Sequence, residues 1–184
     1  MQLRIVAGTH KSRIVTMPDN VRECRPTAQR NRIALCEILK HKIPDACAAD
    51  LCAGSGTVGF ELLSRGAASV CFVEFDRRTM HALRQNALAL NLADQCTFIS
   101  LDVTRFAIGE PPGRYDILFY DPPYGNQQLM DIVPALCLLL NGSGVLVVEQ
   151  GDRRALVPVV EGYAVEARQY GDTVMYFITK KIQE

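Results

Sequence analysis

The sequence has no apolar run long enough to cross a membrane and no paired-cysteine motif. The longest candidate, residues 135–140, falls well short of the roughly 20 residues that a spanning helix needs. The seven cysteines are an odd number and none lies in a C-x-x-C pattern, which argues against a disulfide scaffold or a zinc site. No secretory or transit segment opens the chain. We therefore expect a cytoplasmic protein with reduced cysteines, no metal and no membrane contact.

Net charge is also lacking, because 20 basic and 20 acidic residues cancel, yet the two signs are unevenly spread. Residues 1–42 hold nine Lys/Arg and three Asp/Glu, whereas residues 43–184 are acidic on balance. A length of 184 residues with 48% apolar residues suits one compact core. We divide the chain into a basic appendage, 1–42, and a main body, 43–184. The appendage either meets a polyanion or is simply a solvated surface.

The order of the expected elements favours an α/β fold. Residues 3–7 and 13–17 are expected to pair as a small hairpin, and Thr27 to cap a helix that reaches Lys40. In the main body, strands are expected at 46–51, 70–75, 96–101, 115–120, 144–149, 163–170 and 173–180, with helices at 57–64, 76–91 and 127–140. Strands that alternate with helices and end in a hairpin predict a mostly parallel, seven-stranded, doubly wound sheet with one antiparallel strand.

A glycine-rich loop, residues 50–59, joins the first main-body strand to its helix and contains the pattern G-x-G-x-x-G. Gly54 and Gly56 allow a tight turn with close ligand approach, and Gly59 lets the helix pack against the strand. Many turns of this kind use glycine for packing alone. The same pattern followed by an acid is also the dinucleotide fingerprint, so a nicotinamide oxidoreductase is one interpretation.

Acidic residues end three successive strands, at Asp50, Glu74 and Asp102. A carboxylate at that edge needs a partner, and an adenosine ligand supplies several. We expect Glu74, twenty positions after Gly54, to accept from both ribose hydroxyls, and Asp102 to accept from the adenine amino group. Asp50 would repel a pyrophosphate but attract the cationic amino end of S-adenosylmethionine. The acids therefore favour methyl transfer over hydride transfer.

The tetrapeptide Asp121-Pro122-Pro123-Tyr124 follows the fourth strand and is the predicted catalytic corner. Prolines fix φ and lack N–H groups, so the corner is stiff and offers mainly acceptors. The Asp121 carboxylate and the Pro122 carbonyl could accept both N–H bonds of a nucleobase amino group, while Tyr124 stacks on the ring. A simple proline turn with Tyr124 at its rim is the alternative. The position of this tetrapeptide, after a glycine loop and after strands that end in acids, favours the catalytic interpretation.

Taken together, these motifs resemble the bacterial 16S rRNA guanine-N2 methyltransferase family of the RsmD type. The resemblance rests on Arg4-Ile5-Val6-Ala7-Gly8, on Arg25-Pro26-Thr27 followed by Arg30, on residues 50–59, on Asp121 to Tyr124 and on the closing hairpin Tyr170-Gly171-Asp172-Thr173. It covers nearly the whole chain, and the amino-terminal combination is its specific part. Cys52, Leu35 and Gln29 depart from the family pattern, and Gln29 lies nearest the expected RNA contact.

The resemblance implies a Rossmann-like class I methyltransferase that uses S-adenosylmethionine and methylates the exocyclic N2 of a guanine in 16S rRNA, guanine 966. The implied catalytic residues are Asp121, Pro122 and Tyr124; the cofactor-binding residues are Asp50, Ala53, Gly54, Ser55, Gly56, Glu74 and Asp102; and the RNA-binding residues are Arg4, Lys11, Arg13, Arg25, Thr27 and Arg30. The implied partner is 16S rRNA within a 30S subunit or an assembly intermediate, and we expect a monomer.

Three alternatives stay open. A DNA adenine-N6 methyltransferase would use the same catalytic corner, although no separate target-recognition domain is evident in so short a chain. A non-catalytic RNA-binding assembly factor would need the basic arm but not Asp50, Glu74 and Asp102. A protein-glutamine methyltransferase accounts poorly for the basic arm.

Overall fold

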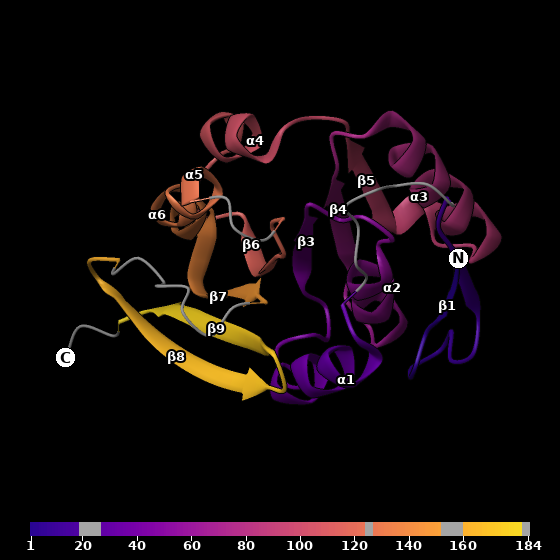
Figure 1. The fold of residues 1–184 in the computed structure, drawn as a ribbon, viewed down its shortest axis with the longest axis horizontal. Helices are drawn as coiled ribbons and strands as arrows, with labels where there is room; N and C mark the ends of the chain where they lie inside the picture. The colour runs from indigo at the N-terminus through magenta and orange to yellow at the C-terminus, as the bar shows by residue number, and fades with distance from the viewer. Residues whose placement is uncertain (19–26, 124–126, 152–159, 182–184) are drawn as a thin grey trace.

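The computed structural model describes residues 1–18, 27–123, 127–151 and 160–181. Two of the predicted site residues, Arg25 and Tyr124, lie outside these ranges. The described chain forms one seven-stranded sheet with helices around it, and a separate two-stranded sheet near the amino terminus (Figure 1). Among the described residues, no helix combines the length and the apolarity needed to span a bilayer.

The seven-stranded sheet has the order β5-β4-β3-β6-β7-β9-β8, and β9 runs in the opposite direction to the other six strands. Its strands are β3 (Cys47–Leu51), β4 (Ser69–Val73), β5 (Cys96–Ile99), β6 (Tyr115–Tyr120), β7 (Leu140–Gln150), β8 (Tyr163–Tyr170) and β9 (Thr173–Lys180). The chain order reverses at β3, so the carboxyl ends of β3 and β6 meet at a topological switch point. The predicted Rossmann-like sheet, with one antiparallel strand, is confirmed.

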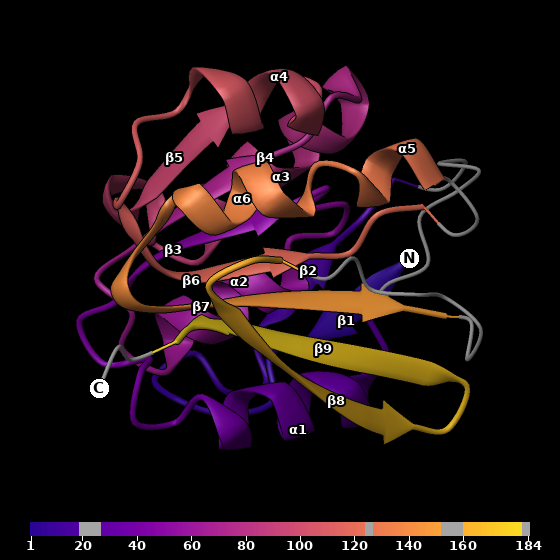
Figure 2. The same cartoon turned by 90° about the vertical axis from the view of Figure 1, so that its left-hand side faces the viewer.

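Helices cover both faces of this sheet, and Figure 2 shows α1 and α6 on opposite sides of the strands. One face carries α1 (Gln29–Ile38), α2 (Thr57–Ser64) and α3 (Arg77–Ala89), and the other carries α4 (Val103–Gly109), α5 (Gln127–Met130) and α6 (Val133–Leu138). Side chains of a strand point alternately to its two faces. Accordingly Ala48, Ile117 and Val147 enter the first core, whereas Ala49, Leu118 and Val148 enter the second.

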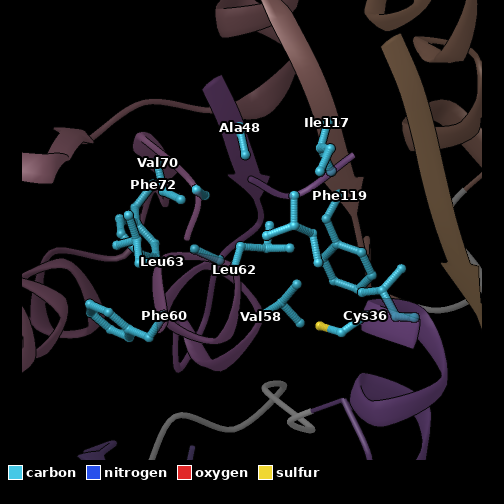
Figure 3. Close-up of a cluster of buried hydrophobic side chains, with 14 of the residues drawn as sticks. Cys36, Ala48, Val58, Phe60, Leu62, Leu63, Val70, Phe72, Ile117 and Phe119 are labelled. Carbon is cyan, nitrogen blue, oxygen red and sulfur yellow. The ribbon is translucent and has the colours of Figure 1, made fainter. Parts of the chain in front are cut away.

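The core on the α1–α3 face is closely packed around the helix that follows the glycine loop. Figure 3 shows Phe60 of α2 beside Phe72 of β4, and the centroids of the two rings are 4.8 Å apart. A Cβ added at Gly59 would lie 2.4 Å from the Phe72 ring, so this glycine is required for helix-to-strand packing. Cys36 of α1 reaches the same core from below in this view.

The predicted amino-terminal hairpin is confirmed as two short strands, β1 (Gln2–Arg4) and β2 (Ile14–Thr16), in which Leu3 lies opposite Val15. Ile5 and Val15 are buried in the core on the α1–α3 face. The hairpin therefore packs on the main body, and the division of the chain at residue 42 stays a prediction.

A buried glutamate fastens the segment after β1 to α2. The carboxylate of Glu61 accepts hydrogen bonds from the backbone N–H groups of Val6 at 2.8 Å and Ala7 at 3.0 Å. A Cβ at Gly8 would lie 1.8 Å from the carbonyl oxygen of Ser64, so only glycine lets the chain approach α2 this closely. The attachment depends on backbone contacts that the sequence pattern did not reveal.

Two local predictions are wrong. Thr27 does not cap α1, whose N-cap residue is Ala28 without a side-chain hydrogen bond; Thr27 is instead buried, with its hydroxyl close to the carboxyl groups of Asp121 and Glu149 at the sheet edge. The helix expected at 127–140 is divided into α5 and α6, and Pro134 occupies the first turn of α6, where its missing N–H is tolerated. Helix α4 and the short helix η1 (Ala93–Gln95) were not expected.

Candidate active site

The glycine loop and the predicted catalytic corner are neighbours because of strand register. Leu51, the last residue of β3, pairs with Tyr120, the last residue of β6. The residues that follow, Cys52 and Asp121, therefore leave the sheet side by side. Both strands are parallel, so both segments lie at the carboxyl edge, where open α/β sheets bind ligands.

The glycine loop turns sharply through a run of left-handed backbone conformations. The φ angles are 58° at Cys52, 52° at Gly54 and 69° at Gly56. A Cβ at Gly56 would also lie 2.3 Å from a Leu83 methyl group, so this position excludes side chains on two grounds. The loop is held in place by the N–H of Ala53, which donates to the carbonyl of Val73 at 3.0 Å. The result is a rigid backbone cradle beside the acids of the neighbouring strands.

Asp50 lies beneath this cradle, buried among apolar side chains. Its Oδ2 accepts from the backbone N–H of Gly59 at 2.9 Å, and no described residue supplies a cation to it. Burial raises the pKa of this carboxyl to about 8, and the nearby charge of Glu74 adds to the shift. A cationic ligand in the cradle would reverse that shift, because it would favour the ionised form.

Glu74 and Asp102, the other two predicted cofactor ligands, already bind the local backbone. Glu74 Oε2 accepts from Gly54 N–H at 3.0 Å, and its Oε1 accepts from Asp76 N–H at 2.9 Å. Asp102 is exposed and caps α4, accepting from the Thr104 N–H at 2.8 Å. Each carboxylate oxygen can accept more than one hydrogen bond, so these contacts leave capacity for a ligand. The binding roles of both acids stay predictions.

Asp121 is half-buried at the end of β6, with Pro122 buried and Pro123 exposed after it. Burial raises the pKa of Asp121 well above its usual range, and the neighbouring acids Glu149 and Asp50 add to the effect. A hydrogen bond from the Thr27 hydroxyl acts in the opposite direction. The predicted catalytic carboxyl therefore lies in a crowded acidic environment.

The acids that end or follow four of the strands are all near enough to Cys52 for their charges to act on its thiol. Burial raises the pKa of the Cys52 thiol above its usual range, and the charges of Glu74, Asp121 and Asp50 add to that shift. Cys52 is thus an inert thiol surrounded by carboxylates. Such a cluster attracts a positively charged ligand. Among the described residues, no group of His, Cys, Asp or Glu side chains has an arrangement that could hold a metal ion.

The predicted RNA-binding residues divide into exposed and buried ones. Arg4, Lys11, Arg13 and Arg30 are exposed. Arg13 donates to the carbonyl of Ala89 on α3 at 2.9 Å, so its guanidinium is partly held against the main body. Thr27, in contrast, is buried at the catalytic corner. The contact of Thr27 with RNA stays a prediction. In the structure, Thr27 lies close to Asp121.

Arg30 lies against the closing hairpin. A Cβ added at Gly171, in the turn between β8 and β9, would lie 2.1 Å from its Nη2. Figure 1 shows this turn beside the start of α1. The guanidinium of Arg30 therefore packs on the backbone of Gly171, which only a residue without a Cβ leaves accessible. This contact joins two motifs that are 141 positions apart along the sequence.

Two residues of the site were missed in the sequence. Glu149, the next-to-last residue of β7, is buried and accepts from Asn31 Nδ2 at 3.2 Å. A signal was available, because Glu149 ends a predicted strand as Asp50, Glu74 and Asp102 do. Asn31 carried no such signal, since its role depends on where α1 packs.

The chain matches a family model described as "Conserved hypothetical protein 95" over residues 3–179. It is 33% identical over 135 residues to ribosomal RNA small subunit methyltransferase D of Escherichia coli (strain K12), which covers 73% of this chain and 67% of that protein. It is 26% identical to putative rRNA methyltransferase YlbH of Bacillus subtilis (strain 168), over 97% of this chain and 100% of that protein. Among solved structures, the putative methyltransferase yhhF of Escherichia coli has a TM-score of 0.86 and 26% identity, with 100% of both chains covered.

Proposed function

The chain belongs to the RsmD-type methyltransferase family, and from this premise we propose that it methylates the exocyclic N2 of a guanine in 16S rRNA, with S-adenosylmethionine as the methyl donor. The observation that carries the proposal is the register of β3 and β6, which puts Asp121 beside the glycine loop. The names of the relatives support rRNA as the substrate.

The residues at the sheet edge fit S-adenosylmethionine, which supplies an electrophilic methyl group on a sulfonium cation. Asp50 has an ionisable oxygen that no described residue neutralises, which suits the cationic amino group of this cofactor. Glu74 keeps acceptor capacity for ribose hydroxyls. The backbone of residues 53–56 forms the surface between them, and its positive φ angles leave room for close approach.

Asp121 and Pro122 would hold the target amino group. The carboxylate of Asp121 and the Pro122 carbonyl accept its two N–H bonds, which fixes the nitrogen and directs its lone pair at the methyl group. Because that lone pair is otherwise delocalised into the ring, positioning and electrostatics supply the catalysis, without a covalent enzyme intermediate. Tyr124 would stack on the base once it has left its helix.

The exposed amino-terminal cations would position the RNA. Arg4, Lys11 and Arg13 lie on and around the hairpin, and none of them belongs to the acid cluster at the sheet edge. Contacts to phosphates fix orientation without reading sequence, so we propose that guanine 966 is selected by how the RNA fold presents this base to the catalytic corner. We propose that the substrate is 16S rRNA in a 30S subunit or an assembly intermediate, met in the cytoplasm by a monomeric enzyme.

The test is a labelled-methyl assay on 30S particles from a strain that lacks the enzyme, with the product mapped to a nucleotide. Asp121→Ala should lower transfer by at least about a hundredfold while the affinity for S-adenosylmethionine stays within a few-fold. Asp131→Asn removes an exposed acid outside the corner and serves as the control. Turnover retained in Asp121→Ala would eliminate the mechanism, and methylated adenine in DNA would favour the rival enzyme.

A non-catalytic assembly factor is the remaining alternative. It has no need of a buried Asp50 beside a strained glycine loop. Equilibrium dialysis with labelled S-adenosylmethionine separates the two, because a chain without catalytic function would bind rRNA but not this ligand.

A further inference from the structure

A buried polar cluster, which we call the support cluster, lies behind Asp121 and consists of Thr27, Asn31 and Glu149. The Thr27 hydroxyl is within hydrogen-bonding reach of both acids, Asp121 and Glu149. Asn31 Nδ2 donates to Glu149 Oε1 at 3.2 Å. All three side chains of the cluster are at least nine-tenths buried, with exposed fractions of 7%, 1% and 2%. The cluster connects the start of α1 to the end of β7 and to the catalytic corner.

Two buried atoms in this cluster have no hydrogen-bond partner, Asn31 Oδ1 and Glu149 Oε2. An ionised Glu149 leaves both of them unsatisfied, because two oxygen acceptors cannot bond to each other, and each such buried group is costly. A proton on Oε2 changes this, since the acid then donates to the amide oxygen while the amide donates to Oε1. The two orphaned atoms belong to the same two side chains that already share one hydrogen bond.

The charges around Glu149 agree with a neutral side chain. Burial raises the pKa of Glu149, although hydrogen bonds from Asn31 and Thr27 and the charge of Arg32 oppose the shift. Arg32 makes no ion pair with Glu149, because its guanidinium donates to the carbonyl oxygens of Thr27 at 2.7 Å and Arg4 at 3.1 Å. The charge of Glu149 also acts on the second acid, Asp121, so the two carboxyls are near enough to interact. Two buried carboxyls at close range do not both ionise near neutral pH.

The two acids differ in where a proton can be accommodated. Glu149 is almost fully buried beside an amide oxygen that needs a donor. Asp121 is only half-buried, next to the cradle proposed for a cation, and it can take the Thr27 hydroxyl as a donor. Burial also raises the pKa of Asp121, and the charge of an ionised Glu149 would add to that shift. The unpartnered Asn31 Oδ1 and Glu149 Oε2 decide between the two acids, because a proton on Glu149 is the one that gives both atoms a partner.

Resting on the methyl-transfer function proposed above, we propose that Glu149 and Asn31 form a neutral acid–amide pair which, with the Thr27 hydroxyl, positions Asp121 and keeps the negative charge of the two acids on it. Asp121 then faces the target amino group as an acceptor alone. A proton on Asp121 would instead place a donor opposite an N–H group. Thr27, Asn31 and Glu149 are positioning residues, since none of them touches the target base.

Kinetics of paired variants test the positioning role. Thr27→Val removes the hydroxyl and should lower kcat by about tenfold or more, while Thr27→Ser restores it, because a hydrogen bond to a charged acceptor is lost in one and kept in the other. Glu149→Ala should lower kcat similarly, and Glu149→Gln should rescue it, since an amide pairs with Asn31 as a neutral acid does. The KM for rRNA should change little in all four. A Glu149→Gln variant as impaired as Glu149→Ala would mean that Glu149 acts as a charge, and would overturn the proposal.

Infrared spectroscopy tests the proton position without any activity. An Asp50→Asn background removes the other buried carboxyl that is protonated near neutral pH. In that background the chain should show the carbonyl stretch of a buried protonated carboxyl that disappears in Glu149→Gln and persists in Asp121→Asn. Loss of the band in Asp121→Asn alone would place the proton on the wrong acid and refute the inference. Failure of the proposed function has a different signature, namely a wild-type chain that binds S-adenosylmethionine but leaves 30S particles unmethylated.

Discussion

Two of the buried glutamates, Glu61 and Glu149, lie on the same face of the sheet but differ in how their oxygens are used. Where the amino-terminal segment docks on α2, Glu61 accepts from Val6, Ala7 and Arg65, so both of its oxygens are bonded. At the carboxyl end of β7, Glu149 has one oxygen bonded and one without a partner. A fully bonded acid holds the structure together, whereas an incompletely bonded one is arranged for a proton or a ligand.

The same distinction sorts the acids at the sheet edge. Glu74 and Asp102 fasten the glycine loop and α4 to the backbone, as Glu61 fastens the hairpin. Asp50 is buried and Asp121 half-buried, both have fewer partners, and burial raises the pKa of each. The comparison predicts that the first pair contributes mainly to stability and the second mainly to ligand binding and catalysis.

The largest effect is expected at the docking glutamate. Glu61→Gln removes a charge and one acceptor from a fully buried site, which should lower the free energy of unfolding by about 2–4 kcal/mol. Glu37→Gln is the matched control, because Glu37 contacts the same Arg65 but its side chain is 61% exposed; it should change stability by less than about 0.5 kcal/mol. Urea denaturation measures both. Equal losses would show that burial does not separate the two acids.

The exposed cations of the hairpin should act on binding alone. Lys11→Gln with Arg13→Gln should weaken binding to an rRNA fragment about tenfold at low salt and less at high salt, because phosphate contacts release counterions. Lys180→Gln with Lys181→Gln removes the same charge at the end of β9, which Figure 1 shows on the opposite side of the molecule from β1, and should have little effect. Fluorescence anisotropy over a salt series is the measurement. Equal effects of the two pairs would indicate attraction by net charge only.

Asp102 tests whether one acid can serve both purposes. Asp102→Ala removes the cap of α4 and should cost about 1 kcal/mol of stability, which Asp102→Ser should largely restore. If Asp102 also accepts from the adenine, Asp102→Ser keeps the stability of the wild-type chain but loses affinity for S-adenosylmethionine. Thermal unfolding and ligand titration on the two variants separate these roles.

The smallest expected effect is the release of a fraction of a proton when the ligand binds. Because the pKa of Asp50 is about 8, this carboxyl is largely protonated at pH 7, and a cationic ligand that lowers its pKa expels the proton. Binding of S-adenosylmethionine should therefore release a fraction of a proton that Asp50→Asn does not release. Calorimetry in two buffers of different ionisation enthalpy measures the difference. An identical release by both chains would show that Asp50 does not meet the cation.

The raised pKa of Asp50 also makes the stability of the fold depend on pH. A pKa raised above the unfolded value means that the folded chain holds the proton more tightly, so the free energy of unfolding falls as pH rises from about 4 to about 8. Asp50→Asn should remove that part of the pH dependence.

The sequence predicted most of the main body because strand ends and loop glycines are local signals. The bounds expected for α2, β6, β8 and β9 agree with the structure. Asp121 could be placed beside the glycine loop because both segments follow parallel strands. Helix α4 was missed because Asp102 was interpreted as a ligand, although its bond to Thr104 N–H is a helix cap that sequence spacing could have indicated.

The rest could not be predicted because it depends on contacts between distant segments. Thr27 has the usual chemistry of a cap, yet the packing of α1 on the sheet edge turns its hydroxyl toward two acids instead. The bonds from Gly54 to Glu74 and from Gly59 to Asp50 likewise join positions 20 and nine residues apart along the chain. No local pattern distinguishes a carboxylate that binds a backbone N–H from one that binds a ligand.

The pairing of Leu51 with Tyr120 has a consequence for how the enzyme can be altered. Backbone hydrogen bonds, and not loop lengths, set the spacing between the cradle and the corner. One residue inserted in the turn at 110–113 would leave that spacing intact, whereas one inserted within β6 would rotate the corner to the opposite face of the sheet. Changes in the lengths of the connecting loops can therefore accumulate while the geometry of the chemical step is inherited unchanged.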